Sequence, residues 1–144
     1  MEPEAKTRKF LIATHGTFAA GVKSSLDIIA GAMEHVFLIQ AYLDDTVSVE
    51  EQISQVMNQI SETDELLIFT DILGGSITNQ ILQHGLRPNV HVISGFNLPL
   101  LIEVVMADTD TPVEETIAAA IDSAKEQMTY VNKLLTVQKE NDDD

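Results

Sequence analysis

Phe10-Leu11-Ile12-Ala13-Thr14-His15-Gly16, near the start of this 144-residue chain, is an unbroken apolar run that ends in Thr-His-Gly. The run predicts a buried strand, and apolar residues at helical spacing over about 17–30 predict that a helix follows it. His15 therefore stands at the carboxyl end of the predicted strand. In open parallel sheets, ligands bind in the crevice outside this edge, where strands lead into helices. We expect the functional site to lie there.

The rest of the chain repeats this alternation of strand and helix. Further strands are predicted over 35–43, 66–69 and 90–94, and further helices begin near Ser48, Ser76, Pro99 and Thr111. Ser48, with Glu51 three residues later, is typical of a capping box, and Ser76 is expected to cap the third helix. The alternation predicts the α/β fold class, as a three-layer sandwich in which helices cover both faces of a mainly parallel sheet.

One domain is expected, from 9 to 137, between two polar ends. Residues 1–8 are predicted to be a disordered or loosely attached tail, and residues 138–144 a charged, acidic tail. The segment from Val131 to Val137 fits two structures, because it could extend the final helix or form an added strand at the edge of the sheet. From the residues alone, both alternatives stay open.

The charge and composition of the chain narrow the classes of function. A net charge of −15 argues against direct binding of nucleic acid or an anionic membrane surface, since both attract basic patches. The absence of cysteine, of an apolar signal segment and of any apolar run of ~18 residues predicts a soluble, cytoplasmic protein. No Lys or Arg occurs between Ser24 and Leu86. An anion near the first strands must therefore be held by backbone N–H groups and helix N-termini, or by a cation from a later segment or a partner.

His15 and Asp71 are the candidate catalytic pair. Each follows a predicted strand, and if the two strands are neighbours the carboxylate of Asp71 accepts a hydrogen bond from one imidazole nitrogen and leaves the other free as a nucleophile. Gly74, Gly75 and Ser76, at the start of the next predicted helix, offer N–H donors and a hydroxyl to an anion. Together, these groups are what the transient phosphorylation of a histidine requires.

Three motifs carry a resemblance to a known family. Thr14-His15-Gly16, the segment Thr70-Asp71-Ile72-Leu73-Gly74-Gly75-Ser76 followed by Asn79, and the turn Gly95-Phe96-Asn97-Leu98-Pro99-Leu100-Leu101 occur in this order. In combination they resemble the mannose-family enzyme IIA domain of the bacterial phosphoenolpyruvate-dependent sugar phosphotransferase system (PTS), which has mannose, fructose and sorbose types. The resemblance covers roughly Lys9 to Leu135.

The resemblance implies roles for the site residues and partners for the chain. His15 would accept a phosphoryl group from the carrier protein HPr and pass it to a IIB component, and Asp71 would orient the imidazole. The residues expected to bind the phosphoryl group are Gly16, Thr17, Gly74, Gly75 and Ser76. The membrane components IIC and IID would be contacted indirectly, in a permease complex. A homodimer is implied in which the C-terminal strand is exchanged with the partner's sheet, which favours a strand over 131–137.

The same residues leave other functions open. The phosphoryl-transfer subunit that supplies dihydroxyacetone kinase shares the fold and the early histidine, and is the main alternative. A hydrolase would use His15 as base and Ser76 as nucleophile, but no G-x-S-x-G motif surrounds Ser76. A regulatory binding module of flavodoxin-like topology would need a cofactor loop, and none is recognisable. The four histidines lack metal-ligand spacing, so neither a metal site nor a cofactor is expected.

Overall fold

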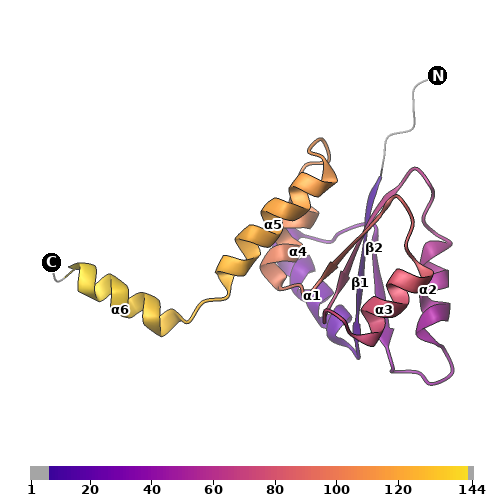
Figure 1. The fold of residues 1–144 in the computed structure, drawn as a ribbon, viewed down its shortest axis with the longest axis horizontal. Helices are drawn as coiled ribbons and strands as arrows, with labels where there is room; N and C mark the ends of the chain where they lie inside the picture. Colours follow the sequence, from indigo (N-terminus) through magenta and orange to yellow (C-terminus); the bar gives the residue numbers. More distant parts are fainter. Residues whose placement is uncertain (1–6, 143–144) are drawn as a thin grey trace.

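The computed structural model describes residues 7–142, which form four strands and six helices (Figure 1). In chain order these elements are β1 (Arg8–His15), α1 (Phe18–Ala30), β2 (Val36–Ala41), α2 (Val49–Met57), β3 (Glu65–Thr70), α3 (Ser76–His84), β4 (Val90–Ser94), α4 (Leu98–Met106), α5 (Val113–Gln127) and α6 (Val131–Asp142). The strands predicted from the sequence are all present. The predicted helices are present as well, with small shifts at their ends.

All strands of the described chain run parallel in one sheet, with the order β2-β1-β3-β4. β1 and β3 are therefore neighbours, and their register pairs Arg8 with Glu65 and Ala13 with Thr70. Helices α1, α4 and α5 cover one face of the sheet, and α2 and α3 cover the other (Figure 1). The predicted three-layer α/β sandwich is confirmed, and the carboxyl ends of β1 and β3 meet at one edge.

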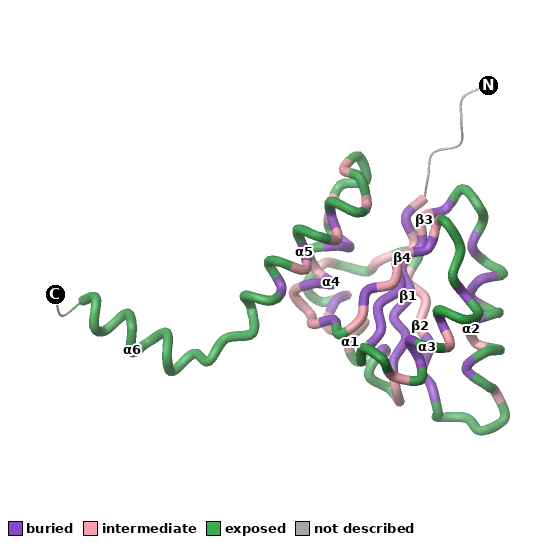
Figure 2. Tube along the Cα trace, viewed as in Figure 1, coloured by how far each residue is buried: buried purple, intermediate pink, exposed green. Residues whose placement is uncertain are grey.

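Alternate residues of the central strands enter two separate cores. Phe10 and Ile12 of β1 pack with α1, α4 and α5, whereas Leu11 and Ala13 pack with α2 and α3. Successive side chains of a strand point to opposite faces, so a strand covered on both faces needs an unbroken apolar run. Figure 2 shows the buried residues concentrated in the sheet and on the helices that cover it. The two cores together fix the positions of β1 and β3.

Capping side chains determine where two of the helices begin. Ser48 accepts a hydrogen bond from the backbone N–H of Glu51 at 3.1 Å, so the predicted cap of α2 is confirmed. Asn97 caps α4 in the same way, by accepting from the backbone N–H of Leu100 at 3.0 Å. Pro99 occupies the first turn of α4, where a missing N–H costs no helical hydrogen bond.

Ser76 does not cap α3, contrary to the sequence-based expectation. The N-cap residue is Gly75, in an extended conformation, and Ser76 is the first residue of the helix. Gly74, just before it, has a φ of +74°, in the left-handed region that glycine adopts without strain. This turn starts the helix one residue earlier than predicted, and it leaves the hydroxyl of Ser76 available for another contact.

The C-terminal segment is a helix and not the predicted edge strand. α6 follows a short break after α5 and extends away from the sheet (Figure 1), and all of its residues are exposed. Val131, Leu134 and Leu135 follow the i, i+3, i+4 spacing of one helix face. With no strand beside it, the backbone of this segment satisfies its hydrogen bonds internally. Of the two structures left open for 131–137, the described chain therefore adopts a helix, and the exchanged strand that the resemblance implies is not confirmed.

Regular elements lie close to both ends of the described residues. β1 already includes Arg8, which is buried with its guanidinium 3.6 Å from the carboxylate of Glu65. Residues 1–6 of the predicted N-terminal tail lie outside the described residues. At the other end, α6 continues through Asp142, past the predicted start of the acidic tail at 138. Within residues 7–142, no helix has the length and apolar character needed to cross a membrane.

Replacing Leu26 with alanine is expected to lower the free energy of unfolding by about 2–5 kcal/mol, because its fully buried side chain on α1 would leave a cavity. Ile28, on the same helix, is 84% exposed. Ile28→Ala is therefore expected to change the free energy of unfolding by less than about 0.5 kcal/mol. Urea titrations followed by circular dichroism measure both variants. Equal losses would contradict the assignment of the two faces of α1.

Candidate active site

The candidate site lies where β1 and β3 end side by side. Asp71 directly follows β3, and its oxygen Oδ2 accepts two hydrogen bonds from His15: one from the backbone N–H at 3.0 Å and one from ring Nδ1 at 2.9 Å. The structure thus brings the predicted pair together. The imidazole is 41% exposed, whereas the side chain of Asp71 is only 9% exposed. Because Nδ1 donates to Asp71, Nε2 is the ring nitrogen that remains free.

The environment of Asp71 keeps its carboxyl ionised. Burial raises the pKa of this carboxyl, but the hydrogen bonds from the backbone and ring of His15, with the charge of that ring, outweigh burial, and the pKa lies below its ordinary value of 3.8. The other oxygen, Oδ1, is buried and has no partner among the described residues. An ionised carboxylate here fixes the imidazole tautomer and stabilises positive charge that develops on the ring.

The residues expected to bind a phosphoryl group form two turns at this edge. Gly16 and Thr17 connect β1 to α1, and Gly74, Gly75 and Ser76 lead into α3. Gly16 has a φ of +59° and donates its N–H to the carbonyl of Ala41 at 2.9 Å. Gly75 donates its N–H to the carbonyl of Ile72 at 3.4 Å. The N–H groups of these two glycines are therefore used within the turns, and the two glycines shape the backbone around the site.

The helices that begin beside His15 are α1 and α3, and their N-termini differ from those of the neighbouring helices. Neither has a capping contact from its N-cap side chain or an acidic residue in its first turn. By contrast, α2 and α4 are capped by Ser48 and Asn97, and α5 carries two glutamates in its first turn. On α1, one early N–H is used, because Ala19 donates to the hydroxyl of Thr14 at 2.8 Å. Of these two N-termini, the one of α3 therefore keeps more of its first backbone N–H groups free to bind an anion.

Tyr42 is a residue of this site that the sequence patterns did not identify. Its ring lies against the imidazole of His15, with ring centroids 5.7 Å apart and an interplanar angle of 38°, and its hydroxyl is 2.6 Å from Oγ of Ser76. Tyr42 directly follows β2, the other neighbour of β1, and has a φ of +68°. A left-handed backbone at a bulky residue costs about 1–3 kcal/mol. The strand-end argument that selected His15 and Asp71 also applies to Tyr42.

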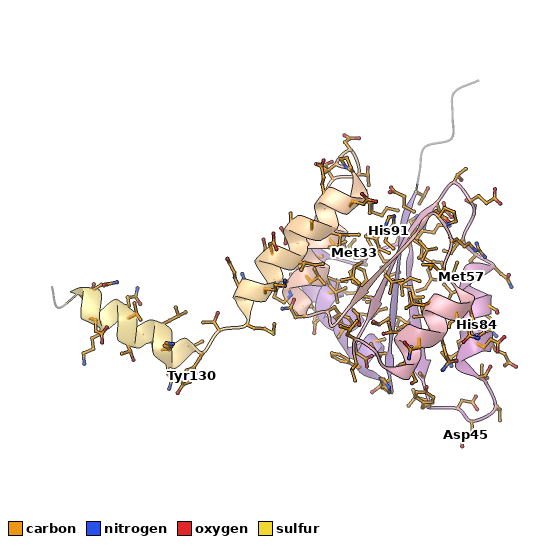
Figure 3. All side chains as sticks on the ribbon, in the orientation of Figure 1. Met33, Asp45, Met57, His84, His91 and Tyr130 are labelled. Atoms are coloured by element: carbon orange, nitrogen blue, oxygen red, sulfur yellow. The ribbon has the colours of Figure 1, made fainter. Side chains whose placement is uncertain are left out.

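The remaining histidines do not share this setting. His84 on α3 lies with its Nδ1 3.9 Å from the carboxylate of Glu50, and His91 is within β4 (Figure 3). No group of three or more potential metal ligands occurs among residues 7–142. Ser76 hydrogen-bonds to Tyr42, while His15 hydrogen-bonds to Asp71. In the part of the chain that the structure describes, the Ser76 and His15 pair that a hydrolase needs is not formed.

Comparison of the sequence with known proteins gives consistent results. The sequence model of the family described as PTS system fructose IIA component (EIIA-man) matches residues 9–121. The chain is 27% identical over 123 residues to the PTS system mannose-specific EIIAB component of Escherichia coli K12, which covers 83% of this chain and 38% of that protein. It is also 27% identical over 97 residues to the PTS system fructose-specific EIIA component of Bacillus subtilis 168, which covers 66% of each. The chain thus spans well under half of the first relative.

Two solved structures with a similar fold are described as parts of the same system. A protein of Klebsiella pneumoniae described as a permease of the phosphoenolpyruvate-dependent sugar PTS has a TM-score of 0.86 at 30% identity, covering 94% of this chain and 98% of that one. The PTS component EIIA of Streptococcus agalactiae has a TM-score of 0.73 at 28% identity, covering 88% and 99%. Both matches extend over nearly the whole of the solved chains. The residues matched by the family model, 9–121, include His15 and Asp71.

Replacing Asp71 with asparagine is expected to remove a stabilisation that depends on pH. Because folding lowers the pKa of Asp71, its carboxylate stabilises the folded chain fully above the ordinary value of 3.8, and this stabilisation is lost as the pH falls through the lowered pKa. The difference in free energy of unfolding between the wild type and Asp71→Asn should therefore shrink below pH 3.8. Urea titrations at several pH values measure it, with exposed Asp45→Asn as the control. A difference that grows toward low pH would contradict the expected sign.

Proposed function

We propose, from the premise that this chain belongs to the PTS fructose IIA family (EIIA-man), that it carries a phosphoryl group on His15. Membership makes the chain a IIA component of the sugar phosphotransferase system. The observation that carries the proposal is the double hydrogen bond between His15 and Asp71, which orders the imidazole and leaves Nε2 as a nucleophile. The activity is that of a phosphotransferase component, transiently phosphorylated on histidine.

Phosphorylation would begin with attack of the Nε2 lone pair of His15 on the phosphorus of the donor. The bond from Nε2 to phosphorus forms as the bond from phosphorus to the donor's leaving atom breaks, and the electron pair of that bond stays on the donor. Nδ1 keeps its proton in the hydrogen bond to Asp71, so the phosphorylated ring is positively charged. The ionised carboxylate of Asp71 stabilises this charge. Transfer to an acceptor reverses the same steps.

Neutral groups would bind the phosphoryl oxygens. The N-terminus of α3, the hydroxyl of Ser76 and Thr17 would supply the donors, while the turns at Gly16 and at residues 74–75 bring the backbone close. The segment from Ser24 to Leu86 contains no Lys or Arg. A phosphoryl group held without an adjacent cation is stabilised less strongly, and its transfer remains close to reversible. This balance suits a carrier that must release the group again.

HPr is the proposed donor and a IIB component the proposed acceptor. Exposed apolar side chains surround the site and would let such partners dock around His15; they are Phe18, Tyr42, Leu43, Ile72 and Leu73. The Escherichia coli relative is an EIIAB component, of which this chain matches 38%. We propose that the exchange takes place in the cytoplasm, and that the membrane components IIC and IID are reached through IIB.

Incubation with phosphoenolpyruvate, enzyme I and HPr tests the proposed role of His15. The wild type should gain a single acid-labile phosphoryl group, and His15→Ala should gain none because the nucleophile is absent. His84→Ala and His91→Ala should label like the wild type, since neither residue lies at the site. Radiolabelled phosphate followed through gel electrophoresis measures all four. A wild type that never labels, or a His15→Ala variant that does, would overturn the proposal.

The acceptor is identified by a second incubation with the phosphorylated chain. Mixed with a IIB component, the wild type is expected to lose its label to IIB. Mixed with the ADP-bearing subunit of dihydroxyacetone kinase, it is expected to keep the label. The opposite result would assign the chain to the kinase and contradict a role in sugar uptake.

We further propose that the chain works as a homodimer held together by α6. No residue of α6 is buried, and Val131, Leu134 and Leu135 are 59%, 56% and 60% exposed. Tyr130, which directly precedes α6, is also exposed (Figure 3). An apolar helix face that its own chain leaves uncovered gains stability by packing against a second copy.

The double variant Leu134→Glu with Leu135→Glu is expected to shift the chain from dimer to monomer, because it places charge on the apolar face of α6. Size-exclusion chromatography with light scattering measures the mass. Thr136→Glu, on the opposite face of the same helix, is the control that should remain a dimer. A wild type that elutes as a monomer at all concentrations would contradict the proposed homodimer.

A further inference from the structure

Tyr42 connects the histidine of the site to the helix that would bind the phosphoryl group. Its ring lies against His15 at the end of β1, and its hydroxyl is 2.6 Å from Oγ of Ser76 at the start of α3. The proposed mechanism makes no use of its hydroxyl. Tyr42 is 56% exposed, so burial in a core does not explain its position. Its left-handed backbone, with φ at +68°, is a conformation that a bulky exposed residue ordinarily avoids.

We propose that Tyr42 is a positioning residue of the phosphoryl site, whose hydroxyl donates to Ser76 and thereby directs the Ser76 proton to the phosphoryl group on His15. The inference rests on the proposed function and extends it by one residue. It assigns Tyr42 no contact with the reacting atoms. Its effect is exerted through the serine, and its ring limits the motion of the imidazole.

The direction of the hydrogen bonds follows from the chemistry of the three groups. Each hydroxyl has one proton to donate, and in the pair at 2.6 Å either oxygen could be the donor. Phosphoryl oxygens only accept, so a phosphoryl group beside Ser76 takes the serine proton. Tyr42 must then donate to Oγ of Ser76, which suits a phenol because it is the more acidic hydroxyl. In such a chain, each hydrogen bond polarises and strengthens the next.

The lack of basic residues near Tyr42 and Ser76 in the sequence increases the contribution of their hydroxyl groups to binding the phosphoryl group. The segment Ser24 to Leu86, which includes Tyr42 and Ser76, holds no Lys or Arg. The N-cap residue of α3 is a glycine, so no side chain there competes for or supplements the first N–H groups of the helix. A hydroxyl with a fixed direction is therefore one of few donors that the phosphoryl group would meet, and fixing it adds to the stability of the phosphorylated state.

The ring of Tyr42 has a separate effect on the imidazole. The hydrogen bond to Asp71 holds His15 at Nδ1, but the ring of His15 is still 41% exposed. Tyr42 covers part of it, with the ring centroids 5.7 Å apart and the planes tilted by 38°. A ring held at one edge and against one face keeps Nε2 in a single direction. Tyr42→Phe retains this contact and removes only the hydroxyl.

The equilibrium distribution of phosphoryl groups between HPr and this chain tests the inference, because it reports the stability of the phosphorylated state and not the rate of docking. Tyr42→Phe is expected to lower the equilibrium constant for phosphorylation by about two- to tenfold, the usual value of one neutral hydrogen bond. Ser76→Ala is expected to lower it by about tenfold or more, because it removes a hydrogen bond to a charged group. Tyr130→Phe, the other tyrosine of the chain, should match the wild type.

A double-mutant cycle separates action through Ser76 from a direct effect. Adding Tyr42→Phe to Ser76→Ala should change nothing further, because the tyrosine then has no serine to orient. Effects that add in the double variant, or a Tyr42→Phe variant with the wild-type equilibrium constant, would overturn the inference while leaving the proposed function intact. A wild type that takes no phosphoryl group from HPr would overturn both.

The phosphorus NMR spectrum of the phosphorylated chain gives a second measurement that a merely structural tyrosine would not affect. The phosphohistidine signal should move in Tyr42→Phe and in Ser76→Ala, and it should stay in place in Tyr130→Phe. A signal unchanged in Tyr42→Phe, with a folded chain by circular dichroism, would contradict a hydrogen-bonded path from the phenol to the phosphoryl group.

Discussion

One carboxylate oxygen holds the site of this protein together. Oδ2 of Asp71 accepts from both the backbone N–H and the ring Nδ1 of His15, so a residue after β3 fixes both the main chain and the side chain at the end of β1. The two bonds on one atom tie the orientation of the ring to the register of the strands. The low pKa of Asp71 has the same origin, because both donors favour the ionised form against the cost of burial.

The fold and the central pair of the site follow from simple sequence patterns. The apolar run at 10–13 is short and unbroken, which indicates a strand covered on both faces. The alternation of such strands with helices indicates a parallel sheet. The patterns identify His15 and Asp71 because His15 ends one strand and Asp71 directly follows another. What the patterns could not provide was the strand order, on which the contact between them depends, and this order comes from tertiary packing.

Two local features were missed for identifiable reasons. Tyr42 reaches His15 through a left-handed backbone conformation, which propensities assign to glycine or asparagine and not to tyrosine. The sequence pattern predicts Ser76 as a cap, but the turn at Gly74 starts α3 one residue earlier, at Ser76 itself. The hydroxyl of Ser76 then contacts Tyr42. At the C-terminus, Val131 to Val137 suits a strand by composition and a helix by spacing. Its structure depends on what lies beside it, and a single sequence does not contain that information.

The alternation of β1 between two cores has a consequence for how this chain can change over time. Phe10 and Ile12 pack against one layer of helices, and Leu11 and Ala13 pack against the other. The backbone of β1 separates the two cores. Substitutions that repack α2 and α3 need no compensation among α1, α4 and α5, so the sequences of the two layers can change independently during evolution. Relatives of modest identity can in this way keep the end of β1 in the same position although most of the residues that cover the strand differ.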